Sequence, residues 1–142
     1  MPPSVPSGMR LELSRARVLP GAEDLAREWM DMLNRRQDEC VKTLSIERCA
    51  FESWFLHTES DGVTWIYWFG LTGEGGEPID VESRLDHDHM DYMRRVKEPG
   101  WEEMQPMFML TPDHIRAALE TWGTTGMAHP TPTHHRPHRT SS

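Results

Sequence analysis

The sequence predicts an α+β domain of the ferredoxin-like type, with the element order β-α-β-β-α-β followed by a C-terminal helix. Two stretches carry apolar residues at helical spacing, and two aromatic stretches flank a hairpin turn at 59–62. The length, 142 residues, is that of one domain. In this fold two helices pack on one face of a four-stranded antiparallel sheet.

Each element follows from a local pattern. Leu11, Leu13 and Val18 are interspersed with charged residues, as in a half-buried strand. Acidic residues at 23–24 favour a helix N-terminus, and a proline and a glycine at 99–100 end the second long helix. The expected elements are a strand at 9–18, a helix at 23–44, strands at 49–58 and 63–70, a loop at 72–80, a helix at 81–96, a strand at 107–110 and a helix at 112–123.

Charge and composition limit the function. Residues 1–8 and 124–142 contain no acidic residue and little that packs, so we expect disordered ends around a domain at 9–123. All 23 acidic residues and 13 of the 15 Lys and Arg lie in that domain, which gives it a charge of −10. Such a surface argues against nucleic acid. The chain also lacks an apolar run of roughly 20 residues and a signal-like start, so we expect a cytoplasmic protein that binds no membrane.

The sequence suggests no cofactor. Cys40 and Cys49 lack metal-site spacing, and we expect reduced thiols. The glycines at 73–76 lie among acids, which disfavours a phosphate loop, and no G-x-S-x-G elbow occurs. The tail contains four histidines between prolines, which predicts a disordered segment with incidental metal affinity: His129, His134, His135 and His138.

The aromatic strands predict a homodimer. Helices cover one face of the expected sheet, and the other face would expose a large apolar patch. Packing of two sheets face to face in a twofold pair is the simple way to cover it.

Three segments carry a resemblance to a known family: P-G-A-E-D-L-A-R-E-W-M at 20–30, F-E-S-W-F-L at 51–56 and D-H-D-H-M-D-Y-M at 86–93. Across nearly all of 10–110 the chain resembles the small bacterial proteins catalogued as domain of unknown function 6176. The resemblance implies a dimeric α+β barrel. The wider superfamily includes cofactor-free monooxygenases, mutarotases, cyclases, lyases and haem enzymes, so the resemblance implies a fold and no single reaction.

In that family a helix begins with an acid–histidine pair followed by an aromatic residue, which falls here on Asp88-His89 and Tyr92. This chain departs from the pattern by a second histidine, His87, and by an extension beyond Leu110. The extension leaves open where the matching domain ends.

His89 is the first candidate catalytic residue, because helical spacing places it on the apolar stripe with Leu85 and Tyr92. A pKa near neutrality would allow this histidine to act both as a general acid and as a general base. The alternatives are a core histidine and a ligand. We expect Asp86 and Asp88 on the outer faces of this helix, in solvent.

Glu52 is the second candidate, because it lies in mid-strand on one face with Trp54 and Leu56. If the helices cover that face, Glu52 and His89 approach each other as an acid/base pair. The alternative is a structural contact of Glu52 with the backbone or an arginine.

Tyr92, one turn from His89, is a third candidate, as a hydrogen-bond donor to a substrate oxygen; packing at the rim is the alternative. The face that Tyr67 and Trp68 present depends on the hairpin register, which the sequence leaves open. The expected substrate-binding residues are large and apolar: Trp29, Trp54, Tyr67, Trp68 and Met93.

The leading function is that of a small cofactor-independent enzyme of secondary metabolism. It would catalyse acid/base cyclisation, isomerisation or dehydration of a hydrophobic, polyketide-like small molecule, as a cyclase, isomerase or lyase. One alternative is an oxygen-using or haem-binding monooxygenase with His89 or His57 as ligand. The other is a binding module without turnover.

Overall fold

The computed structural model describes residues 1–77 and 83–129. The elements are β1 (Met9–Arg17), α1 (Glu23–Arg35), α2 (Gln37–Glu47), β2 (Cys49–Thr58), β3 (Thr64–Gly73), α3 (Arg84–Val96), β4 (Glu102–Glu103) and α4 (Asp113–Thr125). The mixed α+β class is confirmed.

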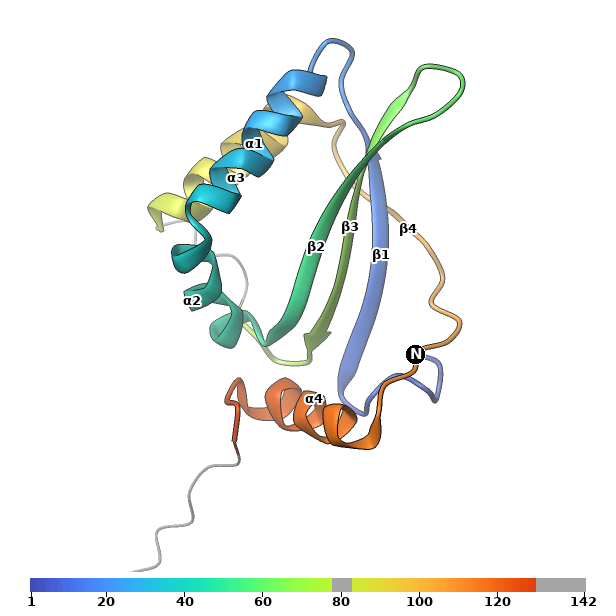
Figure 1. The fold of residues 1–142 in the computed structure, drawn as a ribbon, viewed down its shortest axis with the longest axis vertical. Helices are drawn as coiled ribbons and strands as arrows, with labels where there is room; N and C mark the ends of the chain where they lie inside the picture. Colours follow the sequence, from blue (N-terminus) through green and yellow to red (C-terminus); the bar gives the residue numbers. More distant parts are fainter. Residues whose placement is uncertain (78–82, 130–142) are drawn as a thin grey trace, which may run out of the picture.

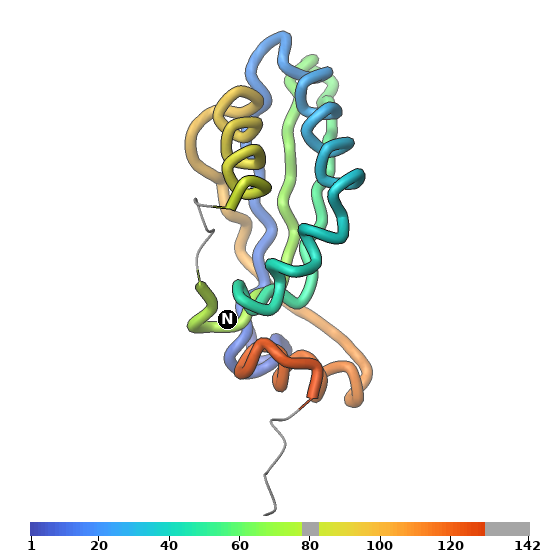
Figure 2. Tube along the Cα trace, turned by 90° about the vertical axis from the view of Figure 1, so that its left-hand side faces the viewer, coloured from blue at the N-terminus to red at the C-terminus, as the bar shows by residue number. Residues whose placement is uncertain are grey.

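The four strands form one antiparallel sheet in the order β2-β3-β1-β4. Helices α1 and α3 lie side by side on one face, and α2 continues their layer toward one end of the sheet (Figures 1 and 2). Helix α4 lies across that same end (Figure 1). This arrangement is compatible with the ferredoxin-like fold.

The main core lies between the sheet and the helices α1 and α3. Trp29 and Val96 are completely buried there, with Ile66 of β3 below them. In the hairpin, Trp54 of β2 pairs with Trp68 of β3. Since directly paired residues share a face, this register places both indoles under the helices. The question that the sequence left open is thereby answered in favour of Trp68.

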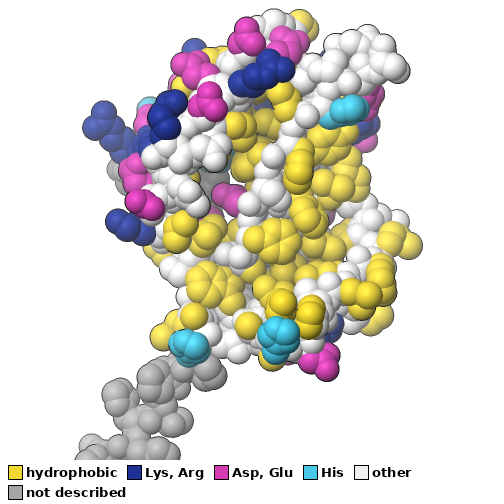
Figure 3. Space-filling model, viewed as in Figure 1, with side chains coloured by type: hydrophobic (Ala, Val, Ile, Leu, Met, Phe, Trp, Pro, Cys, Tyr) yellow, Lys and Arg dark blue, Asp and Glu magenta, His cyan; other side chains and the backbone are white. Residues whose placement is uncertain are grey.

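The opposite face of the sheet is apolar and largely open. Phe55 and Leu13 are exposed on it, and Tyr67 and Phe69 are half-buried. Figure 3 shows hydrophobic side chains gathered over the strands and around α4. A second small cluster around Leu71 closes the end of this face against α4 and the N-terminal segment.

The helix expected at 23–44 is instead two helices that meet at Arg36. The backbone leaves helical geometry there (φ −105°, ψ 28°), while the Arg36 guanidinium pairs with Glu39 and with Asp88 of α3. The apolar spacing continues across this point, so the periodicity could not reveal the break. The second helix extends to Glu47, beyond the expected end.

The strand expected at 107–110 is wrong. The fourth strand is Glu102–Glu103, which pairs with Ser14 and Arg15 of β1. Arg15 Nε of β1 lies 3.3 Å from Glu102 Oε2 of β4, so an ion pair accompanies the backbone pairing of these two strands. The apolar run at 107–110 lies outside the sheet, and most of its side chains are exposed.

The N-terminal segment at 1–8 packs against the domain, contrary to the expected disorder. Val5 is buried in the second cluster, and the Arg116 guanidinium donates to the Ser4 and Val5 carbonyls. Ser4 and Val5 thus contact α4, although Arg116 lies more than 100 residues later in the sequence. The few apolar residues of 1–8 therefore suffice for docking.

Helix α4 ends two residues later than expected. Gly123 lies inside the helix, where a Cβ would collide with Met9, so this glycine serves close packing. Gly126 closes the helix in the left-handed region (φ 67°). Similarly, β3 runs to Gly73, beyond the expected end at 70.

Three expectations fall partly outside the described residues: the end of the loop at 72–80, the start of the helix at 81–96 and most of the tail at 124–142. Helix α3 is described from Arg84, with Ser83 as its N-cap. Within 1–77 and 83–129, no helix has the length and apolar character needed to cross a bilayer.

Candidate active site

A cleft of about 400 Å³ lies between the sheet, the last turn of α2 and the part of α3 that contains His89 and Met93. Figure 3 shows a hollow with an acidic side chain inside it, between the helices α1 and α2 and the strand β2, where an adjoining cavity lies. The described lining is acidic and aromatic: Glu12, Glu47, Glu52, Glu77, Trp54, Trp68, Trp101, His89, Met93, Thr72, Gly73, Gly75 and Gly76.

Glu52 occupies the centre of this region. It lines the cleft and two adjoining cavities of about 530 and 50 Å³. Its carboxylate accepts a hydrogen bond from Trp68 Nε1 at 3.0 Å. Gly70 faces Glu52 across the hairpin, and a Cβ there would lie 2.5 Å from the Trp68 ring. The glycine therefore allows Trp68 to lie flat enough to reach the carboxylate.

His89 reaches the same cleft from α3, so the structure brings together the acid and the histidine that the sequence paired. Trp29 Nε1 donates to His89 Nδ1 at 2.9 Å. A nitrogen that accepts this bond carries no proton, so the neutral ring holds its proton on Nε2. Burial lowers the His89 pKa to about 4. The ring is thus a neutral donor at pH 7, in contrast to the near-neutral titration expected from the sequence.

Glu47 is a site residue that the sequence reasoning missed. It lines the cleft from the last turn of α2, together with Glu52 and His89. Burial, followed by repulsion from Glu52 and Asp86, raises its pKa to about 7, against a small opposing effect of a hydrogen bond with Thr43. A signal existed: Glu47 continues the stripe of Cys40 and Leu44 at helical spacing, beyond the expected helix end.

Indole rings form the apolar wall of the cleft. The Trp54 ring lies 5.7 Å from His89 and 5.7 Å from Trp101, both measured between centroids. Trp68 and Met93 complete this wall. Trp54 also contacts Trp29, at 4.9 Å, which connects the wall to the core.

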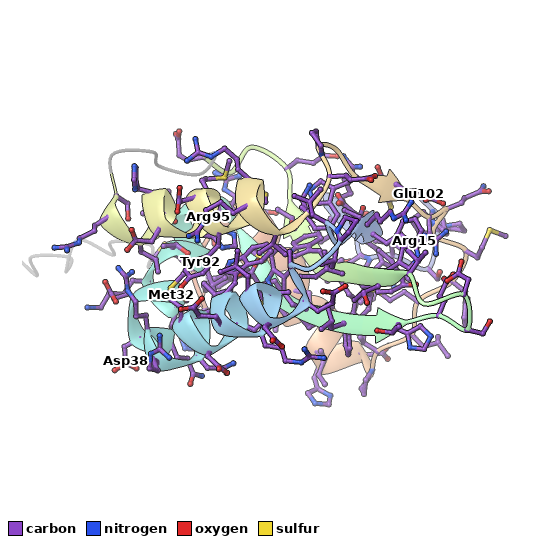
Figure 4. The ribbon with its side chains drawn as sticks, turned by 90° about the horizontal axis from the view of Figure 1, so that it is seen from above. Arg15, Met32, Asp38, Tyr92, Arg95 and Glu102 are labelled. Atoms are coloured by element: carbon purple, nitrogen blue, oxygen red, sulfur yellow. The ribbon has the colours of Figure 1, made fainter. Side chains whose placement is uncertain are left out.

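Three expected site residues lie elsewhere. Trp29 is completely buried and reaches the cleft only through its contacts with His89 and Trp54. Tyr92 packs against the core with Met32 in the helical layer, as Figure 4 shows, and Arg95 lies over its ring. Tyr67 is on the opposite face of the sheet, paired with Phe55. The structure therefore leaves both phenols outside the cleft.

The acidic neighbours of His89 differ from each other. Asp88 is half-buried and lies 2.7 Å from Arg36, which keeps the Asp88 pKa low. Asp86, expected in solvent, is buried and lines the smallest cavity with Glu47. The expectation for Asp86 is wrong because Asp86 lines cavities that Thr43 and Glu47 of α2 also line. His87 is exposed, and its Nδ1 lies 3.8 Å from the Asp88 carboxylate.

The cysteines are free thiols, as expected; Cys40 is half-buried and Cys49 is buried. Burial raises the pKa of both, to about 12 for Cys49. In the described part of the chain, no group of three or more His, Cys, Asp or Glu is arranged to hold a metal ion.

Comparison with known proteins adds the family. No curated protein and no solved structure matches the chain. Residues 9–117 match a family of unknown function (DUF6176), and the match reaches from β1 into α4. It covers well over half of the chain and confirms the resemblance seen in the three segments, so the protein belongs to this family of unknown function.

Proposed function

We propose that the protein is a cofactor-independent enzyme that transfers protons on a small hydrophobic molecule, in a cyclisation, an isomerisation or a dehydration. The observation that carries the proposal is that Glu47, Glu52 and His89 line one cleft. Their environments also separate their proton affinities, because the Glu47 pKa is raised to about 7 and the His89 pKa is lowered to about 4. Such separation is typical of sites that divide acid and base roles.

The roles follow from the protonation states. Near pH 7 Glu47 is present both with and without its proton, so it can give or take one. Glu52 is its partner carboxylate, oriented by Trp68. His89 stays neutral and offers Nε2–H to a developing oxyanion, such as an enolate. The ionised carboxylate removes a proton from the substrate and the protonated carboxylate supplies another, after which exchange with solvent restores both.

The test is exchange of the α-hydrogens of 2-tetralone, a hydrophobic ketone, in D₂O, followed by NMR. We expect acceleration over the buffer reaction, and losses of roughly 10²- to 10⁴-fold in Glu52→Gln or Glu47→Gln. The double variant should lose little more than the worse single one, because the two act together. His87→Ala, which changes an exposed neighbour of His89, is the control.

Full exchange activity in Glu52→Gln and Glu47→Gln would refute this role. A Soret band in the purified protein would instead favour the haem-binding alternative, with His89 or His57 as ligand. Binding of a small molecule without any proton exchange would favour the binding module.

We also propose that the open face of the sheet pairs with the same face of a second copy. Support comes from the exposed Phe55 and Leu13 beside the half-buried Phe69 and Tyr67. Light scattering should give a dimer mass at micromolar concentration, and Phe55→Asp should shift it toward the monomer. A monomer mass for the unaltered protein would contradict this pairing.

A further inference from the structure

The charge of the cleft is one-sided. Four of its lining residues are carboxylates, and none of the described lining residues is Lys or Arg. Glu12 lies 3.5 Å from Arg10, whereas no ion pair joins Glu47, Glu52 or Glu77 to another described residue. A molecule that enters the cleft therefore meets negative charge that the protein leaves largely uncompensated.

The aromatic wall favours the same kind of molecule for a different reason. The faces of Trp54, Trp68 and Trp101 carry the negative side of the ring quadrupole, which attracts cations. One cation already uses this wall: the Lys97 ammonium lies 4.4 Å from the Trp101 ring centroid. That ammonium is held by the Glu98 and Gly100 carbonyls, so it is not available to neutralise the carboxylates of the cleft.

We propose that the molecule bound in this cleft is a small organic cation, an ammonium attached to an aromatic or aliphatic group. The apolar part packs against the indoles, and the ammonium lies beside Glu47 and Glu52. This inference rests on the proposed function for the location of the site and adds the chemical class of the substrate. A neutral or anionic molecule of equal size would leave Glu47 and Glu52 without a cation and would gain no cation–π attraction from the rings.

Binding of the organic cation would displace the proton that Glu47 holds. Glu47 binds a proton near pH 7 because burial and the neighbouring Glu52 and Asp86 disfavour its charged form. An ammonium beside Glu47 reverses that balance and releases the proton to solvent. Binding at pH 7 should therefore release about half a proton per molecule bound.

The experiment is calorimetric titration of the full chain at pH 7 with phenethylamine, phenethyl alcohol and phenylacetate, which share a ring and differ in charge. The amine should bind at least tenfold more tightly than the other two. Repeating the titration in phosphate and in Tris measures the released proton, since these buffers differ in ionisation enthalpy. Release should occur with the amine and vanish in Glu47→Gln.

Glu28→Gln is the matched control, because it removes the same charge from an exposed position on α1. We expect Glu52→Gln to weaken amine binding tenfold or more and Glu28→Gln to leave it within twofold. Equal binding of the alcohol, absence of amine binding, or equal losses in both variants would overturn the inference. Exchange on 2-tetralone without amine preference would overturn the inference alone, whereas amine binding without any exchange would overturn the proposed function alone.

Discussion

Alternate residues of β2 point to opposite faces of the sheet, and the two faces differ in chemistry. Glu52 and Trp54 lie on the face under the helices and line the cleft. Phe55 and His57 lie on the other face and are exposed. Apolar residues usually lie inside and acids outside. Glu52 is itself exposed where it opens into the cleft, so β2 presents an acid to solvent on one face and apolar side chains on the other. As proposed, a small molecule binds at the first face and a second copy at the other.

The helices cause part of this difference. Helix α1 packs on the sheet through Trp29, but α2 turns at Arg36 and has no buried residue. Two of the cavities that Glu52 lines lie in the space between α2 and the sheet. A single unbroken helix would continue in the direction of α1. The break at Arg36 is therefore part of what forms the site.

The largest expected effect is the difference in free energy of unfolding between the Trp29→Ala and Phe55→Ala variants. Trp29 is completely buried, so Trp29→Ala should lower the free energy of unfolding by about 3–5 kcal/mol. Phe55 is 55% exposed, so Phe55→Ala should change it by less than about 0.5 kcal/mol at concentrations where the protein is monomeric. Urea unfolding at low concentration measures both. Similar losses in the two variants would mean that the outer face is part of the core.

A smaller effect concerns the pH dependence of stability. The folded-state pKa of Glu47 is about 7, against an ordinary value of 4.5. Between these pH values the folded state holds a proton that the unfolded state lacks. The stability gained from that proton is complete below pH 4.5 and is lost as the pH rises through 7. Glu47→Gln has no proton to lose there, so it should be more stable than the unaltered protein by about 1–2 kcal/mol at pH 8.

At pH 5 the same substitution should change stability little, because Glu47 is then mostly protonated. His89 contributes in the opposite direction: its depressed pKa means that stability falls as the pH drops from 6.5 toward 4. That contribution is common to both proteins and cancels in the difference between them. Urea unfolding at pH 5 and pH 8 checks the prediction. A stabilisation that is equal at both pH values would show that Glu47 titrates normally.

Much of this arrangement could be predicted from local patterns. Period-two spacing in β2 places Glu52 beside Trp54, and period-3.6 spacing in α3 turns His89 inward. Both patterns report which residues share a face of one element. They could not decide whether Tyr67 or Trp68 joined them, because that depends on how two strands pair, and a shift of one residue reverses the answer.

Other features could not be predicted because they depend on contacts between distant segments. The ion pairs of Arg36 accompany a helix break that the apolar spacing conceals. The fourth strand pairs through acidic residues rather than through the apolar run that follows them. The Trp29–His89 hydrogen bond joins residues 60 positions apart and leaves the ring proton on Nε2, while burial lowers the His89 pKa to about 4.

The central claim is that the carboxylates of the cleft exchange protons while His89 remains a neutral donor held by Trp29. An NMR titration of the histidine ring nitrogens tests it most directly, with the His89 signal assigned by its loss in His89→Gln. We predict a midpoint at about pH 4 and, above it, a proton on Nε2. A midpoint near 6.5, or a proton on Nδ1 at neutral pH, would contradict the claim.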